Sequence, residues 1–234
     1  MTDTSDNAFA IGRKAAYAVH LIRNHTVVLW FLGFLSLANA TIPLFRDSAL
    51  FMPATTVMVV LSIVATPVIY GLFYQLIDGS SASFHSLAKT YIAPYLWLLL
   101  RMYLPAILLA SLPAIMFAEH GSGGYLEIGL IAFSMLYLYV IPCFYLSGRQ
   151  HGAIVRGISF LTRHLTASTP LLLTVLLLES ALLLVHYART ALAGQAVLLL
   201  AGVDFFVFLT ASLVDLAVFI ILVQILKNAN LHDQ

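Results

Sequence analysis

The chain has 234 residues, of which 62% are hydrophobic and 9% are charged, and its formal net charge is +1. Soluble domains are roughly 45 to 50% apolar, so this composition argues against a water-soluble domain and predicts a membrane protein. The small net charge argues against nucleic-acid binding, which requires a basic face or stripe. With a single cysteine, Cys143, the chain can form neither an internal disulfide nor a cysteine-based metal site.

Six apolar runs are long enough to cross a bilayer as helices. A hydrocarbon core of about 30 Å requires roughly 20 residues in a helix, and lipid offers no partners for free backbone groups. The sequence therefore predicts an all-α membrane bundle of six transmembrane helices, with residues 1–234 in one domain. The predicted spans are residues 26–45, 50–77, 94–117, 125–147, 169–187 and 196–226.

The distribution of Lys and Arg predicts the orientation, because basic residues are retained on the cytoplasmic side of a membrane. Outside the predicted spans, Arg46 and Arg189 fall on one side. The other side contains Arg13, Lys14, Arg23, Lys89, Arg149, Arg156, Arg163 and Lys227. We therefore expect a multi-pass protein of the inner (plasma) membrane with both termini in the cytoplasm.

An alternative for the N-terminal segment is a cleaved signal peptide. Arg13, Lys14 and Arg23 precede an apolar stretch that reaches Ala38-Asn39-Ala40, an A-x-A pattern that resembles a cleavage site. However, the basic region is long for a signal, and the hydrophobicity continues beyond Ala40. A retained first helix fits this pattern better.

Each pair of predicted spans is preceded by a segment with helical periodicity on the cytoplasmic side. The predicted unit is an amphipathic helix followed by a transmembrane hairpin, and it occurs at residues 8–77, 80–147 and 149–226. In residues 149–166, four apolar residues recur at i, i+4, i+7 and i+11, opposite three arginines. The apolar residues are Ile154, Ile158, Leu161 and Leu165, and the arginines are Arg149, Arg156 and Arg163.

Two interpretations of these amphipathic helices remain open. Apolar burial holds such helices on the inner leaflet, together with about 1 kcal/mol per basic side chain near anionic lipid. The helices either only anchor and orient the hairpins, or also provide a docking surface for lipids or for a membrane or cytoplasmic protein. In the second interpretation, Arg149, Arg156 and Arg163 form the candidate lipid or partner surface.

The tract Pro142 to Pro170 contains the core Arg-Gly-Ile-Ser-Phe-Leu-Thr-Arg-His between two predicted spans. In this arrangement the chain resembles a group of uncharacterised bacterial inner-membrane proteins, the YciC-like family and relatives of the membrane domain attached to some glycerophosphodiester phosphodiesterases. The resemblance covers most of the chain but concerns its architecture. It implies six helices and no known chemistry, and no functional residue is carried over from it.

Five ionisable residues fall within the predicted spans, where an ionised side chain costs about 2.5 to 3.5 kcal/mol near the bilayer centre. They are Arg101, Glu127, Glu179, Asp204 and Asp215. Arg101 and Glu127 are close enough to the ends of their spans to reach the headgroups by snorkelling. Glu179 lies near the middle of its span and cannot escape in this way.

The spacing of these residues predicts a polar seam between the last two spans. Asp204 and Asp215 are eleven residues apart and return to nearly one helix face, and Glu179 shares a face with His186. Arg101 is the internal counter-charge that we expect. The seam is compatible with proton or cation transport, and equally with helix packing through hydrogen bonds of about 0.6 kcal/mol each.

Four prolines lie inside predicted spans, namely Pro67, Pro105, Pro113 and Pro142. Each removes a backbone hydrogen bond and bends its helix. Broken helices mark substrate sites in many transporters. Proline is also common in membrane helices, so ordinary kinks are the alternative.

Motifs for catalysis and metal binding are absent from the sequence, which contains no His-x3-His, HExxH or G-x-S-x-G. We therefore expect no enzyme activity, no metal and no cofactor. The primary hypothesis is a non-enzymatic accessory or scaffold subunit that interacts with lipids or partner proteins. The alternative is a small proton- or cation-coupled transporter that uses Glu179, Asp204 and Asp215.

Overall fold

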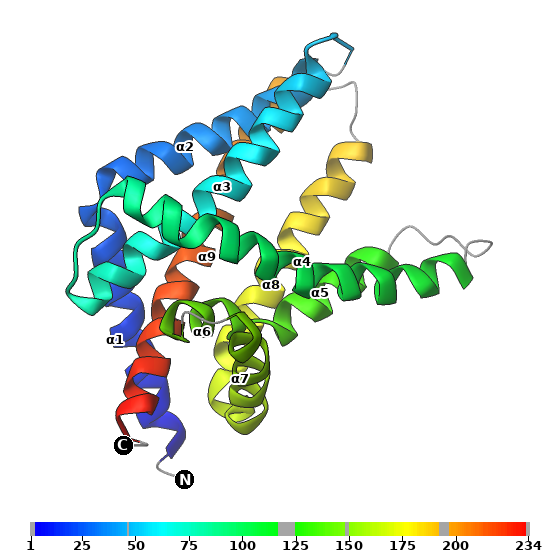
Figure 1. Ribbon diagram of the computed structural model, residues 1–234. Helices are drawn as coiled ribbons and strands as arrows, with labels where there is room; N and C mark the ends of the chain where they lie inside the picture. Colours follow the sequence, from blue (N-terminus) through cyan, green and yellow to red (C-terminus); the bar gives the residue numbers. More distant parts are fainter. Residues whose placement is uncertain (1–2, 46, 117–124, 148–149, 192–196, 233–234) are drawn as a thin grey trace.

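The computed structural model describes residues 3–45, 47–116, 125–147, 150–191 and 197–232, and these residues form helices and no strands (Figure 1). The α-helices are α1 (Asp3–Asn24), α2 (Thr26–Thr41), α3 (Phe51–Asp78), α4 (Phe84–Met116), α5 (Tyr125–Leu136), α6 (Val140–Ser147), α7 (Gln150–Arg163), α8 (Leu165–Ala191) and α9 (Val197–His232). A 3-10 helix, η1 (Ile42–Phe45), follows α2. The all-helical prediction is thus confirmed for this part of the chain.

Five helical segments in the described ranges are long and apolar enough to cross a membrane. They are Thr26–Phe45, Phe51–Asp78, Phe84–Leu109, Leu165–Val185 and Leu199–Ala229. Each overlaps one of the predicted spans. These helices are compatible with insertion into a bilayer, because an α-helix pairs its backbone groups within the segment and leaves few of them to be satisfied by lipid.

The remaining predicted span, residues 125–147, is divided between α5 and α6 by a turn at residues 137–139. Pro142 accounts for this break. It has no N–H to donate to the carbonyl of Leu138, and its ring clashes with that carbonyl in a continuous helix. Within the turn, the Val140 amide donates a 2.9 Å hydrogen bond to the third residue before it, as in a 3-10 helix.

The three predicted amphipathic segments differ from one another. α1 and α7 are separate helices, and each ends at a one-residue junction, His25 before α2 and His164 before α8. In contrast, α4 runs without interruption from Phe84, so the middle segment forms the first turns of a long helix. Separate helices therefore precede the spans at two of the three expected positions.

α9 is the centre of the packing and contacts α1, α2, α3, α6 and α8. Its buried apolar side chains are concentrated between residues 216 and 226: Leu216, Val218, Phe219, Ile220, Ile221, Leu222, Val223 and Leu226. Toward the start of α9, Leu199 and Phe206 are each 67% exposed. One half of α9 is therefore enclosed by protein, and much of the other half faces outward.

α1 covers the C-terminal part of α9 and buries Ala18 and Ile22. Lys14 lies on the same helix and is half-buried. Burial disfavours its charged form, and the adjacent positive charge of Arg13 adds to this effect, so the pKa of Lys14 lies below its ordinary value.

The ends of α3 and α9 are joined by a polar contact. Lys227 Nζ lies 2.6 Å from Asp78 Oδ1 and also donates to the Ile77 carbonyl at 3.3 Å. α3 ends at Asp78, and the next residue, Gly79, has a φ of 71°, the left-handed conformation that favours glycine after a helix C-terminus. α1 and the end of α9 lie together at the bottom of Figure 1.

The helices do not form a parallel bundle. In Figure 1, α2 and α3 run together toward the top, whereas α4 and α5 run as a pair toward the right, and the upper part of α8 lies between these pairs. The pairs meet around the middle of α9. Two cavities lie in this region: one is lined by α2, α3 and α9, and the other is lined by residues of α3, α4, α5, α6, α8 and α9.

Two glycines allow close contact between helices. A Cβ at Gly157 of α7 would lie 2.7 Å from the backbone N and Cα of Val140 in α6. A Cβ at Gly71 of α3 would lie 2.6 Å from the Tyr91 ring of α4. The first contact is the more restrictive, because it is made with backbone atoms that cannot rotate away.

Candidate functional site

Asp215 lies between two cavities that follow one another along α9. The cavity on the α2 side is lined by residues within 208–216 of α9, and the cavity on the α8 side by residues within 215–222. Thr66, Tyr70 and Asp215 line both cavities. Asp215 is exposed despite its position in the middle of a long apolar helix, because its side chain faces these two spaces.

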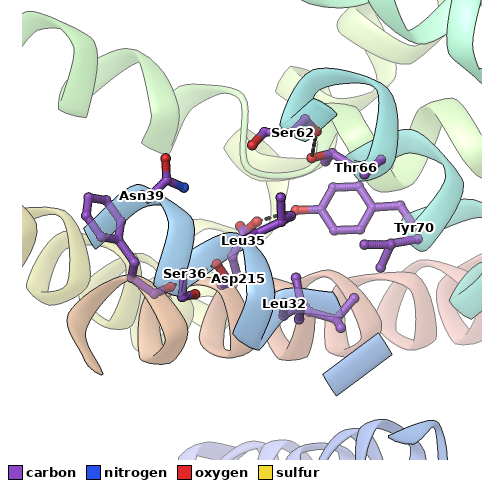
Figure 2. A pocket seen from close by; sticks show the side chains of 13 residues that line it. Leu32, Leu35, Ser36, Asn39, Ser62, Thr66, Tyr70 and Asp215 are labelled. Carbon is purple, nitrogen blue, oxygen red and sulfur yellow. Dashed lines mark hydrogen bonds between the residues drawn. The ribbon is translucent and has the colours of Figure 1, made fainter. Parts of the chain in front are cut away.

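The α2-side cavity has a volume of about 140 Å³ and is lined by α2, α3 and α9. Figure 2 shows Ser36 and Asn39 on α2, opposite Ser62 and Thr66 on α3. The polar residues lining this cavity are Ser36, Asn39, Ser62, Thr66, Tyr70, Ser212 and Asp215. More than half of the lining residues therefore carry a hydroxyl, amide or carboxyl group.

The α8-side cavity has a volume of about 290 Å³ and brings together two of the acidic residues, Glu179 from α8 and Asp215 from α9. Four tyrosines, a threonine and a serine line it as well: Tyr70, Tyr95, Tyr103, Tyr137, Thr66 and Ser134. This cavity thus combines two carboxyl groups with several hydroxyl groups, which can donate or accept hydrogen bonds.

Tyr70 holds the Asp215 carboxyl group at the boundary between the cavities. Its hydroxyl donates a short hydrogen bond to Asp215 Oδ2, which Figure 2 shows as a dashed line. The Tyr70 ring is stacked on Phe219, with ring centroids 4.3 Å apart. Tyr70 is 6% exposed, so packing fixes the position of the hydroxyl.

Tyr145 of α6 supports Tyr70 from behind. Its hydroxyl donates a 2.8 Å hydrogen bond to the Pro67 carbonyl of α3, and its ring makes an edge contact with Tyr70. Tyr91 and Phe219 also contact the Tyr145 ring. This aromatic group connects α3, α4, α6 and α9 directly beside the Asp215 carboxyl group.

The broken helix also borders the α8-side cavity. Tyr137 and Leu138 from the turn, and Ile141 and Pro142 from the start of α6, line it. The Leu138 carbonyl cannot receive the usual helical hydrogen bond, because residue 142 is proline. A backbone interruption is therefore located at the same cavity as Glu179 and Asp215.

The other members of the predicted seam are placed differently. Asp204 is buried on α9, at 2% exposure, and it lines neither of the two cavities. Arg101 is exposed on α4 and also lines neither cavity. His186 lies in α8, but its side chain is outside the described part of the structure. The two cavities therefore bring together Glu179 and Asp215 from the predicted set.

The sequence did not single out Tyr70 or the uncharged polar residues that line the α2-side cavity, which are Ser36, Asn39, Ser62, Thr66 and Ser212. Tyr70 is separated from Asp215 by 145 positions. Ser36 and Ser62 are uncharged residues in apolar runs, where serine is common at helix contacts. The chain contains 11 tyrosines, and buried tyrosines usually find a hydrogen-bond partner. This number could have indicated that some tyrosines form hydrogen bonds inside the protein.

The predicted basic surface and the buried side of α7 lie on different faces of the helix. Arg156 and Arg163 are exposed, while Ala153 and Leu161 are buried, so part of the apolar stripe packs against protein. Arg149 lies outside the described residues. Among the side chains that the structure describes, no group of three or more His, Cys, Asp or Glu residues could hold a metal ion.

Comparisons with protein-family models, with curated protein sequences and with solved structures find no match to this chain. The function is therefore inferred from the geometry of the chain itself.

Proposed function

We propose that this chain is an integral membrane protein that transports protons or a small cation past Asp215. The observation that carries the proposal is the position of this carboxyl group, in the middle of a long apolar helix and facing two successive cavities. Ionisable residues within a membrane are costly, and they commonly mark ion pathways or proton relays. A carboxyl group that can be reached from two sides could accept an ion from one cavity and release it to the other.

The chemistry of the α8-side cavity supports this role. Glu179 supplies a second carboxyl group, and the tyrosine hydroxyls supply neutral oxygen atoms. Oxygen ligands suit protons and hard cations. The interrupted helix at residues 137–139 is a further feature that transporters use at ion sites. Tyr70 stabilises Asp215 between transfers through its hydrogen bond.

For the membrane arrangement, we propose six crossings, with α5 and α6 together forming the fourth. The N- and C-terminal ends are assigned to the cytoplasm of a cell bounded by an inner (plasma) membrane, because basic residues accumulate on that side. The Lys227–Asp78 contact supports a common side for the ends of α3 and α9. In this arrangement α1 and α7 lie at the cytoplasmic interface.

The competing role is an accessory or scaffold subunit in which the acidic residues only hold helices together. A dry and fully packed seam would favour that role. The polar cavities around Asp215 instead favour transport, because a purely structural carboxyl group does not require open space on two sides.

The test is ion flux into proteoliposomes with the purified chain. A pH-sensitive dye inside the vesicles reports proton movement, and Na⁺ and K⁺ gradients are tested in turn. We expect Asp215→Asn to reduce the flux by about tenfold or more, because an amide cannot exchange a proton or neutralise a cation. Glu179→Gln should reduce it less, since Glu179 lines one of the two cavities.

Asp204→Asn is the matched control, because it changes an acid of the same helix that lines neither cavity. It should retain flux, provided that both variants elute as a single species from size-exclusion chromatography. Absence of ion flux with the wild-type chain, or equal flux in wild type and Asp215→Asn, would overturn the transport proposal.

A further inference from the structure

A third cavity, of about 580 Å³, lies at the end of the bundle where α6, α7 and α9 meet. Arg156 and Arg163 line one side of it, together with His164. The part of this cavity that the structure describes contains no acidic residue. It is separate from the Asp215 site, and none of the described residues that line it also lines either of the other two cavities.

The two guanidinium groups are available for a ligand. Arg156, Ser159 and Arg163 follow the spacing i, i+3 and i+7, which places them on one face of α7, and all three line the cavity. Neither arginine forms a hydrogen bond or an ion pair within the described residues. Arginine binds phosphate through paired, charge-assisted N–H donors, so this arrangement suits a phosphate group.

Most of the remaining lining is apolar, although Ser147, Ser159 and His164 also line the cavity. Leu146, Val155 and Leu226 line the cavity beside the arginines, and Val155 is 71% exposed. A soluble anion gains nothing from these side chains. An amphiphile, in contrast, would place its acyl chain against them while its headgroup meets the arginines.

The position of the cavity matches the boundary of a bilayer. The apolar segment of α8 begins at Leu165, directly after Arg163 and His164, and the apolar segment of α9 ends at Ala229, which also lines the cavity. Basic pockets between membrane helices on the cytoplasmic side bind anionic lipid headgroups. The basic side chains, the apolar lining and the position at the membrane boundary therefore all indicate an anionic lipid as the ligand.

We propose that this cavity binds one anionic phospholipid, with the phosphate held by Arg156 and Arg163 and an acyl chain along Leu146 and Val155. The proposal rests on the membrane placement given above and is independent of ion transport. If the chain binds the lipid but shows no ion flux, the lipid binding supports this inference and the absence of flux overturns the transport role.

The experiment is native mass spectrometry of the full chain in detergent with added dioleoylphosphatidylglycerol or dioleoylphosphatidylethanolamine. We expect one bound phosphatidylglycerol and clearly weaker retention of the zwitterionic lipid. The double variant Arg156→Gln/Arg163→Gln should bind phosphatidylglycerol roughly tenfold or more weakly, because it loses two basic groups. The double variant Arg156→Lys/Arg163→Lys keeps the charge, so its affinity for phosphatidylglycerol should fall less.

The control is Arg23→Gln/Lys89→Gln, which removes two exposed basic residues from outside the cavity. It has the same net charge as the double variant and should bind phosphatidylglycerol like the wild type. Equal loss in this control, or equal retention of the two lipids by the wild type, would overturn the site. Millimolar inorganic phosphate that displaces the lipid completely would show a soluble anion site and would also overturn the lipid assignment.

Discussion

The two halves of α9 differ sharply in their surroundings. From Leu216 to Leu226 the helix is enclosed by its neighbours, whereas near its start Leu199 and Phe206 face outward. Asp215 lies where the first environment gives way to the second. Dense packing between Leu216 and Leu226 fixes the surrounding helices, and the α8-side cavity is lined by residues 215–222 of this same helix. Phe219 belongs both to the enclosed half and to the lining of the α8-side cavity, so stability and the candidate ion site share this part of the helix.

The largest expected effect comes from truncating an aromatic side chain in the enclosed half. Phe219→Ala removes a ring that is 3% exposed and stacked on Tyr70. The free energy of unfolding should fall by about 3 kcal/mol, the low end for Phe→Ala in soluble cores, because lipid tails are as apolar as the core itself. The control Phe206→Ala should change it by less than about 1 kcal/mol, as measured by SDS titration in mixed micelles. Equal losses for the two variants would contradict the contrast between the halves.

A smaller effect is expected from adding one methyl group where helices touch. Gly157→Ala places a Cβ against the Val140 backbone, so α6 and α7 must move apart. Overpacking of this kind costs about 1 to 3 kcal/mol, which thermal unfolding in detergent should detect as a lower midpoint. In the open half of α9, Gly202 has no heavy atom within 4 Å of the corresponding position. Gly202→Ala should therefore be neutral or stabilising, because alanine favours a helix, and a lower midpoint for it would count against open packing there.

The smallest effect is expected at the boundary between the halves. Tyr70→Phe keeps the stacked ring but removes the hydroxyl that donates to Asp215. The free energy of unfolding should fall by about 0.6 to 1 kcal/mol, as is typical for a hydrogen bond between membrane helices. The matched change Tyr74→Phe, on the same helix and outside both cavities, should cost less. The same SDS titration compares the two variants, and a larger loss for Tyr74→Phe would place the important hydrogen bond elsewhere.

Local periodicity predicted the helices well because it depends on neighbours within a few residues. The segment expected at 149–166 became α7, Gln150–Arg163. The uninterrupted α4 could not be predicted from the sequence. The helical periodicity at its start fits either a separate amphipathic helix or the first turns of a span. Of the four prolines that were expected to bend their helices, Pro67 lies within the continuous α3, whereas α5 and α6 are separated before Pro142. The sequence marks possible bends, and tertiary packing decides which of them becomes a break.

The candidate site was predictable in part. Glu179 and Asp215 could be placed together because charged residues are rare in apolar helices and α8 directly precedes α9. The Tyr70 contact joins α3 to α9 and depends on how the helices are arranged, which a single sequence does not encode locally. Arg101 was expected beside the acids on charge alone, yet its position on α4 is outside both cavities.

The interruption before Pro142 leaves the Leu138 carbonyl without the hydrogen bond that residue 142 would donate in a continuous helix, and Leu138 is one of the residues that line the α8-side cavity. The Leu138 carbonyl belongs to the backbone, so no substitution at position 138 removes its oxygen. An ion that uses this oxygen would keep one ligand even when both carboxyl groups are replaced by amides. Such a double variant would then change which ions are preferred, because the formal charge is lost while a neutral dipole remains.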